Sequence, residues 1–258
     1  MVNLNEYCSL CREVLADKKN SHIIPKFLSK DLFTTPNAKH AVEINRDGST
    51  RKLQSTAKLD YLFCNECEHR FEMLETKVSK TFQKLKVFEN YPSDFVVKQL
   101  GVQTYLELSI NPSIFTLFIY SLIFRCSISH HKVNQPFKLP VFVEDQLRKY
   151  ILTSTLENSI SIQNLEGDAQ PSYHYCIIKP ERKFIEFQGM YVTSQLNENI
   201  YMIVVNDFLL FFYLNDSIDE VLRQFSNKNT DMINIAIADD KRWLELNKSI
   251  VQKMLTGV

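Results

Sequence analysis

The sequence has little glycine, no net charge and no long hydrophobic run. Only 5 of its 258 residues are glycine, whereas 18 are phenylalanine and 11 are tyrosine. This composition excludes an intrinsically disordered chain and favours a compact fold of one large or two modest domains. The 30 basic and 30 acidic residues balance, so the protein as a whole does not attract nucleic acid by its charge. Nucleic-acid binding would need a local basic patch.

The sequence also lacks the segments that direct a chain to a membrane. Its first residues, MVNLNEYCSL, do not show the basic region followed by an apolar one that marks a signal peptide. The strongest apolar run, residues 114–124, ends at Arg125 and falls short of the roughly 20 residues that span a bilayer. We therefore expect a soluble, cytoplasmic protein without membrane contact, in which this run is a buried helix.

The part of the chain after about position 112 lacks a catalytic motif. It has no glycine-rich phosphate loop, no paired-histidine metal motif and no nucleophile elbow. We therefore expect residues 91–258 to serve as a scaffold, as a sensor, or as a surface for a homodimer or a partner protein.

Cysteine is the residue type that carries the clearest chemical signal. Four of the six cysteines form two Cys-x-x-Cys pairs, Cys8 with Cys11 and Cys64 with Cys67. In an intracellular protein such pairs indicate metal binding before disulfides. Each pair can turn sharply and present both thiolates to one ion, and four thiolates complete the tetrahedron of a structural Zn²⁺ site. The alternative is four unrelated buried cysteines. We expect Cys126 and Cys176, which lie in apolar stretches, to be core residues without chemistry.

Periodicity and turn residues predict a mixture of helices and strands. Helices are expected at residues 68–88, 94–108, 113–130, 140–155, 216–225 and 239–255. Strands are expected at residues 159–163, 173–179, 184–187, 200–205 and 208–214, and a hairpin over 40–54 with its turn at 45–48. The sequence therefore predicts an α+β protein, with a zinc-binding module in residues 1–90 and a helical and antiparallel-β domain in residues 91–258. The boundary is expected between residues 78 and 112.

One histidine, His22, lies between the two cysteine pairs in the stretch SHIIPKFLSK. The order Cys-x-x-Cys, His-Ile-Ile-Pro and Leu-Phe-Cys-Asn-Glu-Cys leading into a helix resembles the zinc-containing HNH endonucleases of the His-Me finger group. Residues 8–155, with SHIIPKFL, CNECEHRFEMLE, LFIYSLIFRCSIS and EDQLRKYIL, resemble more closely a family of uncharacterised bacterial HNH-like proteins. The resemblance implies that residues 1–90 form a zinc-stabilised ββα module that clamps one divalent metal ion. It also implies a cytoplasmic endonuclease with a role in bacterial defence.

The resemblance assigns roles to individual side chains. His22 falls on the general base that activates a water molecule for attack on a phosphodiester. Glu68 falls next to the second cysteine pair, where the family usually has a metal-binding asparagine or histidine. Glu72 and Glu75 follow on the same helix at one-turn spacing. Such carboxylates suit a catalytic Mg²⁺ or Mn²⁺ ion.

The sequence departs from the family pattern at Ser21, where an active nuclease has an acidic metal ligand. It also lacks the common Asn-x-x-Lys ending of the helix. Either Glu68 with Glu72 or Glu75 holds the metal differently, or the nuclease site is inactive. Glutamates in the first turns are also expected simply from the favourable helix dipole. The second hypothesis is therefore a catalytically inactive, zinc-stabilised module that binds nucleic acid or protein.

Basic residues near the two cysteine pairs are candidates for contact with the phosphates of DNA or RNA. They are Lys26, Lys30, Arg46, Arg51, Lys52 and Lys58, followed on the expected helix by Arg70, Lys77, Lys80, Lys84 and Lys86. We expect Arg46, Arg51 and Lys52 of the hairpin to clamp the nucleic-acid backbone. The helix residues are equally expected as a solvated face.

Overall fold

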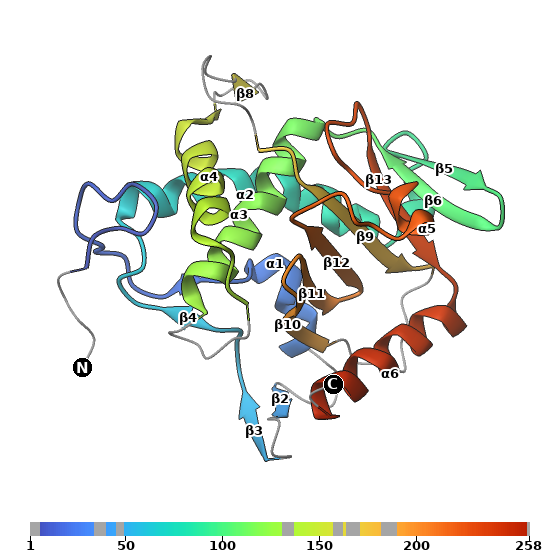
Figure 1. The fold of residues 1–258 in the computed structure, drawn as a ribbon, viewed down its shortest axis with the longest axis horizontal. Coiled ribbons are helices and arrows are strands. Elements are labelled where there is room, and N and C mark those ends of the chain that lie inside the picture. The colour runs from blue at the N-terminus through green and yellow to red at the C-terminus, as the bar shows by residue number, and fades with distance from the viewer. Residues whose placement is uncertain are drawn as a thin grey trace.

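A mixed seven-stranded β-sheet forms the centre of the computed structural model (Figure 1). The structure describes residues 6–33, 40–44, 49–130, 137–156, 162–163, 171–181 and 190–256. In spatial order the strands are β10 (Met190–Asn197), β11 (Ile200–Asn206), β12 (Phe208–Tyr213), β9 (His174–Pro180), β13 (Ile233–Ala238), β6 (Gln103–Leu108) and β5 (Phe95–Leu100). Neighbouring strands are antiparallel except β9 and β13, which run parallel. The fold is α+β, as the sequence predicts.

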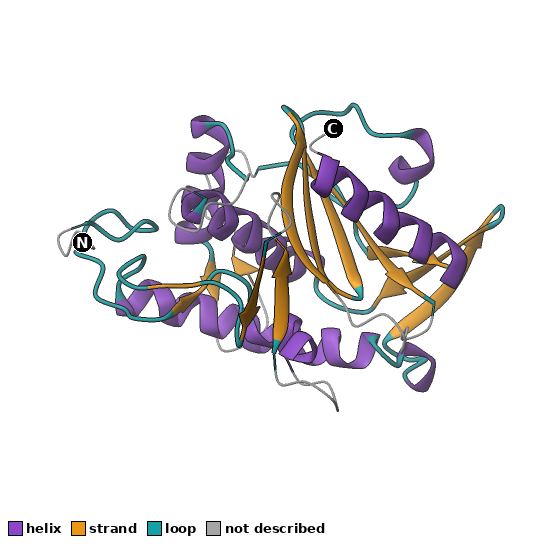
Figure 2. Cartoon of the chain, turned by 90° about the horizontal axis from the view of Figure 1, so that it is seen from below, coloured by secondary structure: helices purple, strands orange, loops and turns teal. Residues whose placement is uncertain are grey.

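Helices cover both faces of this sheet (Figure 2). One face carries α1 (Lys26–Ser29), α2 (Asn65–Leu85), α3 (Pro112–Ser129) and α4 (Val141–Thr153), and the other carries α5 (Glu220–Arg223) and α6 (Asp240–Thr256). Successive strand residues point to opposite faces. On β9, Ile177 therefore packs in the same core as α2 and α3, whereas Ile178 packs with Trp243 of α6. The near-continuous apolar strands follow from this double coverage.

Helix α3 is enclosed by the other elements. Asn111 caps its first turn by accepting a hydrogen bond from the Ile114 amide at 3.1 Å, and Pro112 occupies a position where no amide is needed. By length and composition α3 could cross a membrane, yet 83% of it is buried inside the protein. It is a core helix, as the sequence predicts for this run.

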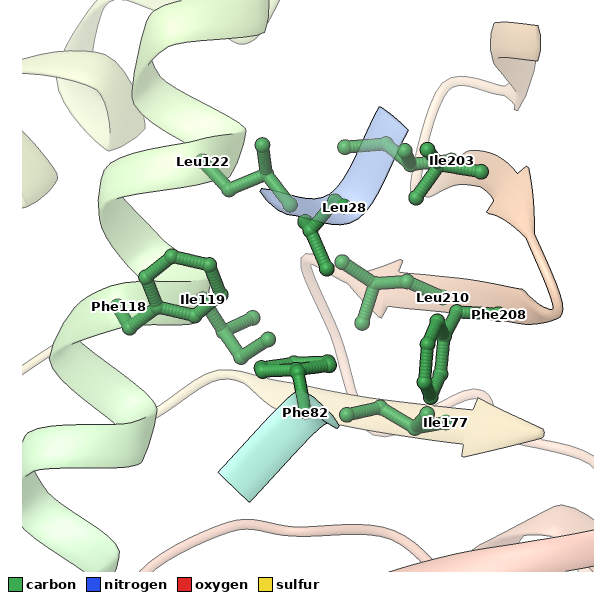
Figure 3. Close-up of a pocket in the computed structure, with 10 residues that line it drawn as sticks. Leu28, Phe82, Phe118, Ile119, Leu122, Ile177, Ile203, Phe208 and Leu210 are labelled. Atoms are coloured by element: carbon green, nitrogen blue, oxygen red, sulfur yellow. The ribbon is translucent and has the colours of Figure 1, made fainter. Parts of the chain in front are cut away.

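Phe82 of α2 lies where the helices meet the sheet. Its ring centroid is 5.6 Å from those of Phe115 and Phe118 on α3, and 5.1 Å from that of Phe208 on β12. Beside it is a cavity of about 20 Å³, and the residues that line it, Leu28 and Leu210 among them, are all apolar (Figure 3). An apolar cavity near the size of one water molecule stays dry. We interpret it as a packing gap rather than a ligand site.

The segment before α2 consists of short elements. They are β1 (Ser21–His22), the 3₁₀ helix η1 (Lys30–Phe33), β2 (Ala41–Ile44), β3 (Thr50–Leu53) and β4 (Lys58–Leu59). Strand β1 pairs antiparallel with β4, and β2 pairs antiparallel with β3. The two strands of the hairpin predicted over 40–54 are thereby confirmed, while its turn at 45–48 lies outside the described residues. Three further short elements are η2 (Phe88–Asn90), β7 (Thr155–Leu156) and β8 (Ile162–Gln163).

One hydrophobic core joins both parts of the chain. Leu10 and Leu74, from residues 1–90, belong to the same buried cluster as Ile123 and Ile235, from residues 91–258. A division of the chain at residue 90 stays a prediction, but the two parts share their apolar interior.

Several predicted elements are confirmed and one is wrong. Helices α2, α3, α4 and α6 and strands β9, β11 and β12 lie where the sequence places them. The helix predicted over 94–108 is instead the hairpin of β5 and β6. Val96, Val97 and Tyr105 are of types that favour strands, and Gly101 adopts the positive φ of 60° that the tight turn needs. The spacing of the apolar residues suggested a helix in this segment, but it does not exclude a pair of strands.

Other differences concern extent and omission. The helix predicted over 216–225 is reduced to α5, whose first turn is capped by the Asp219 carboxylate at 2.9 Å from the Val221 amide. Strands β10 and β13 were not predicted. The strand expected at 184–187, and residues 159–161 of another, lie outside the described residues.

Replacing Phe82 with alanine should destabilise the protein by roughly 3–5 kcal/mol, because the change enlarges a gap between three packed elements. Denaturant unfolding checks this value. The matched control is Phe142→Ala on α4, because Phe142 is 66% exposed and its removal should cost little. Equal losses for both variants would show that α2 does not depend on this contact.

Candidate functional site

The first cysteine pair lies in a tight turn. The Cys8 amide donates to the Val14 carbonyl at 2.8 Å, and the Arg12 amide donates to the Cys8 carbonyl at 2.9 Å. Arg12 has a positive φ of 62°, which reverses the chain directly after Cys11. The turn thus brings both sulfur atoms to the same side of the loop.

The second cysteine pair begins α2. Cys64 is the residue before the helix, and the Glu68 amide donates to its carbonyl at 3.0 Å. The Asp17 carboxylate accepts from the Asn65 amide at 2.7 Å, which satisfies one free amide of the first turn. The Ser9 amide donates to the Leu62 carbonyl at 3.0 Å. This bond holds the loop of the first pair against the segment that leads into the second pair.

The four cysteine side chains form a cluster with the composition and spacing of a metal centre. The sulfur atoms of Cys8, Cys11, Cys64 and Cys67 all lie within 4.8 Å of one another, and those of Cys11 and Cys64 are 4.0 Å apart. A tetrahedral zinc site with Zn–S bonds of about 2.3 Å has sulfur atoms about 3.8 Å apart. The cluster can therefore hold a metal ion such as zinc with small adjustments. Thiolate donors favour zinc over hard cations such as Mg²⁺.

The protons of these thiols would compete with a metal ion for the sulfur atoms. A hydrogen bond from Cys67 lowers the pKa of Cys8 to about 4, and the same contact, together with burial, raises the pKa of Cys67. Without a cation, one thiolate is stabilised by neighbouring thiols that must stay protonated. A divalent cation allows all four to ionise, so binding releases protons and contributes to folding.

A second polar cluster forms between α2, α3 and the short strand β1, which carries His22. In the pairing of β1 with β4, Ser21 is opposite Leu59 and His22 is opposite Lys58, and α2 follows β4 in the chain. Ser21 is 1% exposed, and its hydroxyl donates to Oε2 of Glu68 at 2.9 Å. The residue that stands where an acidic ligand was expected therefore contacts the neighbouring glutamate.

Arg125 reaches this cluster from α3. Its Nη1 donates to Oε1 of Glu75 at 2.7 Å and to the backbone carbonyl of His22 at 3.2 Å. The guanidinium lies 5.0 Å from the centre of the Phe71 ring, and Nη2 is buried without a hydrogen-bond partner among the described residues. Sequence reasoning assigned Arg125 no role. The one charged residue within a strongly apolar helix is the signal that could have found it, because buried arginine is rare unless paired.

The three glutamates of α2 to which the sequence assigned a role, Glu68, Glu72 and Glu75, differ in their surroundings. Glu68 and Glu75 face the polar cluster, whereas Glu72 is exposed and lies 3.8 Å from Nζ of Lys18 and 3.6 Å from Nδ1 of His69. A group of three or more histidine, cysteine or carboxylate ligand atoms that lie within 4.8 Å of one another could hold a metal ion. Among the described residues, only the four cysteines form such a group. The carboxylates and His22 do not form a ready three-ligand site.

Burial sets the protonation of the cluster. It lowers the pKa of His22 below the ordinary value of 6.5; Lys58 lowers it further, and Glu75 opposes the shift. His22 is therefore neutral at pH 7, as a general base must be. Burial also raises the pKa of Glu68 above its ordinary 4.5, while the hydrogen bond from Ser21 acts in the opposite direction. A carboxylate that is costly to bury gains from a nearby cation.

The basic residues of the hairpin are placed unequally. Arg51 forms an ion pair with Glu43 on the facing strand, with Nη2 3.3 Å from Oε1. Lys52 is exposed, and Arg46 lies outside the described residues. On α2, Arg70 donates to the Ser154 carbonyl at 2.5 Å, at the end of α4. The charge of Arg51 is thus partly neutralised by Glu43, and Arg70 has a structural contact.

Comparison with known families and proteins adds no assignment. No protein-family model, curated protein or solved structure matches the chain.

Purified protein should contain about one zinc ion per chain, because four thiolates make a closed site. Cys64→Ser should lose the ion and unfold at lower denaturant concentration, since zinc binding contributes to folding. Metal analysis and denaturant unfolding measure both effects. The matched control is Cys176→Ser, because Cys176 is buried outside the cluster and donates to the Leu222 carbonyl, which serine can also do. Wild-type protein without zinc would rule out this assignment.

Proposed function

We propose that the protein is a metal-dependent endonuclease of the HNH type that hydrolyses phosphodiester bonds in DNA or RNA. One arrangement carries the proposal. The short strands β1 and β4 and the helix α2 adjoin the cysteine cluster, and they hold a neutral histidine and a half-buried glutamate on neighbouring elements. This is the set of groups that phosphodiester hydrolysis requires: a base for water and an oxygen ligand for a hard cation.

Each side chain has a definite role in this proposal. His22 takes the proton of the attacking water, since its ring is half-buried and neutral. Glu68 is the carboxylate that holds Mg²⁺ or Mn²⁺, because Glu75 is already paired with Arg125 and Glu72 lies apart. Mg²⁺ commonly binds through one or two carboxylates, water and substrate phosphate, and it would stabilise charge on the phosphate. The cysteine cluster with its zinc is structural.

Cations near His22 suit a nucleic-acid substrate. Lys58 on β4 and Lys26 on α1 are both exposed and act electrostatically on His22. Lysines in this position would contact substrate phosphates next to the base. In this proposal Lys52 of the hairpin, which is also exposed, is a further contact for the nucleic-acid backbone.

His22→Ala should lower Mg²⁺- or Mn²⁺-dependent cleavage roughly 10²- to 10⁴-fold, because the general base is lost. Glu68→Gln should lose the metal-dependent cleavage, because the ligand of the metal ion is removed. Glu72→Gln, one turn away and exposed, is the matched control that should cleave like the wild type. Plasmid and single-strand cleavage measures all three. Cleavage that is equal in the wild type and His22→Ala, or absent from both, refutes the proposal.

The cleavage rate should also depend on pH through His22. The neutral form is the base, and burial lowers its pKa below 6.5, so the rate should be constant near pH 7 and fall only as the pH drops through the lowered pKa. An acidic limb centred above 6.5 would contradict this role. The pH profile should be measured with Mg²⁺ at a saturating concentration.

A second candidate function has its own observation. Ser21 donates to Glu68, and Arg125 pairs with Glu75, so both carboxylates have partners without any metal ion. This favours a non-catalytic module that binds nucleic acid or protein, with residues 91–258 as a dimer or partner surface.

Ser21→Asp distinguishes the two candidates. An aspartate there adds the missing oxygen ligand, but it also places a carboxylate beside Glu68, which only a cation can balance. Cleavage gained only in this variant would indicate that the native role is binding. Cleavage by the wild type would support the endonuclease.

A further inference from the structure

We propose that Arg125 is the positioning residue of the His22 site, an inference that rests on the proposed function: its guanidinium fixes the strand that carries His22 and keeps the Glu75 carboxylate engaged in an ion pair. Arg125 touches neither the substrate nor the reacting atoms in this proposal. It acts through the backbone of His22 and through the charge of Glu75.

The contacts of Arg125 join three elements that are distant in sequence. Nη1 alone bonds the Glu75 carboxylate of α2 at 2.7 Å and the His22 carbonyl of β1 at 3.2 Å, while Nε donates to the Ser121 carbonyl of α3 at 3.3 Å. The side chain is 3% exposed and lies against Phe71. A planar, permanently charged guanidinium can make these bonds at once, whereas a lysine ammonium has a different geometry.

The strand that carries His22 needs such a contact. Strand β1 has two residues and pairs with another two-residue strand, β4, and the Ile23 amide adds a bond of 3.3 Å to the Ala57 carbonyl. A strand this short has little pairing of its own to fix its position. The hydrogen bond from Arg125 to the carbonyl of His22 fixes the backbone at this residue, and so fixes the position from which its side chain extends.

The charges around His22 come from four elements. They are Lys58 on β4, Lys26 on α1, Glu75 on α2 and Arg125 on α3. Glu75 is the acid among them, and it favours the protonated, inactive form of the base. Because Arg125 pairs with Glu75, it opposes this effect twice, by its own charge and by balancing that of the carboxylate.

The first test needs no cleavage activity. NMR of the full zinc-loaded protein should follow the carbonyl ¹³C shift of His22, which reports the hydrogen bond, and the titration of its ring. Arg125→Met should change the carbonyl shift and raise the pKa of His22, since a cation is lost and Glu75 is released. Arg125→Lys should change the carbonyl shift while keeping the positive charge. If Arg125→Met does not fold, Arg125→Lys still tests the hydrogen bond to the His22 carbonyl.

His69 is the internal reference for this experiment, because it lies on α2 with its side chain 67% exposed and contacts Glu72. Its backbone carbonyl ¹³C shift should be the same in all three proteins. Zinc content is measured in each to exclude loss of the cysteine centre. A His22 carbonyl shift that is identical in the wild type and in both Arg125 variants overturns the proposal.

The second test uses cleavage. Arg125→Met should lower the rate by about 10²-fold, as expected for a displaced base, and move the acidic limb of its pH profile to higher pH, while Arg125→Lys should restore the limb in part. Variants that cleave with the wild-type rate and profile overturn the positioning role but leave the endonuclease intact. NMR changes at His22 in a protein that does not cleave would instead refute the endonuclease while the placement of His22 by Arg125 stands.

Discussion

The burial of helix α3 is the constraint on which the rest of the structure depends. A helix that is apolar on every side must be enclosed by other elements, and here α2, α4 and the sheet surround it. The contacts of Phe82 with Phe115, Phe118 and Phe208 bring α2 against both α3 and the sheet. Because α2 is one rigid helix, this packing near its end also places its first turn, where Cys64, Cys67 and Glu68 lie.

The one charge within α3 then determines the polar cluster. A buried arginine without partners is strongly unfavourable, and Arg125 is compensated by Glu75 and by two backbone carbonyls. Its Nη2 still lacks a partner among the described residues, a cost of roughly 1–3 kcal/mol. The packing of the core helix α3 therefore also determines which groups lie next to the backbone of His22.

Two kinds of ligand chemistry lie next to each other on α2. Cys67 belongs to a thiolate cluster that suits zinc, and Glu68, the next residue, offers oxygen and faces the other polar cluster. Soft sulfur and hard oxygen donors select different cations. Helical geometry turns successive side chains by about 100°, so adjacent residues can serve separate sites. A metal ion held by the four cysteines would fix the start of α2, next to the carboxylate of Glu68.

The local patterns of the sequence determined much of this protein. The spacing of the two Cys-x-x-Cys pairs predicted the cysteine cluster, and the strongly apolar run of residues 114–124 predicted α3 as a core helix. The helix predicted over 94–108 failed because side-chain periodicity competes there with β-branched residues and with the turn at Gly101. The sequence also could not distinguish the surroundings of Glu72 from those of Glu75. Both follow another glutamate of α2 by one helical turn, and they differ only in the residues that contact them.

Only the tertiary structure determined which residues lie near His22. Arg125 is 103 residues from His22 and 50 residues from Glu75 along the chain, too far for any local pattern to pair them. Their meeting follows from the burial of an apolar helix, which carries one charge into the interior. That charge can be accommodated only where a carboxylate and free carbonyls face it, because an unpaired ion in a low-dielectric interior is too costly to keep.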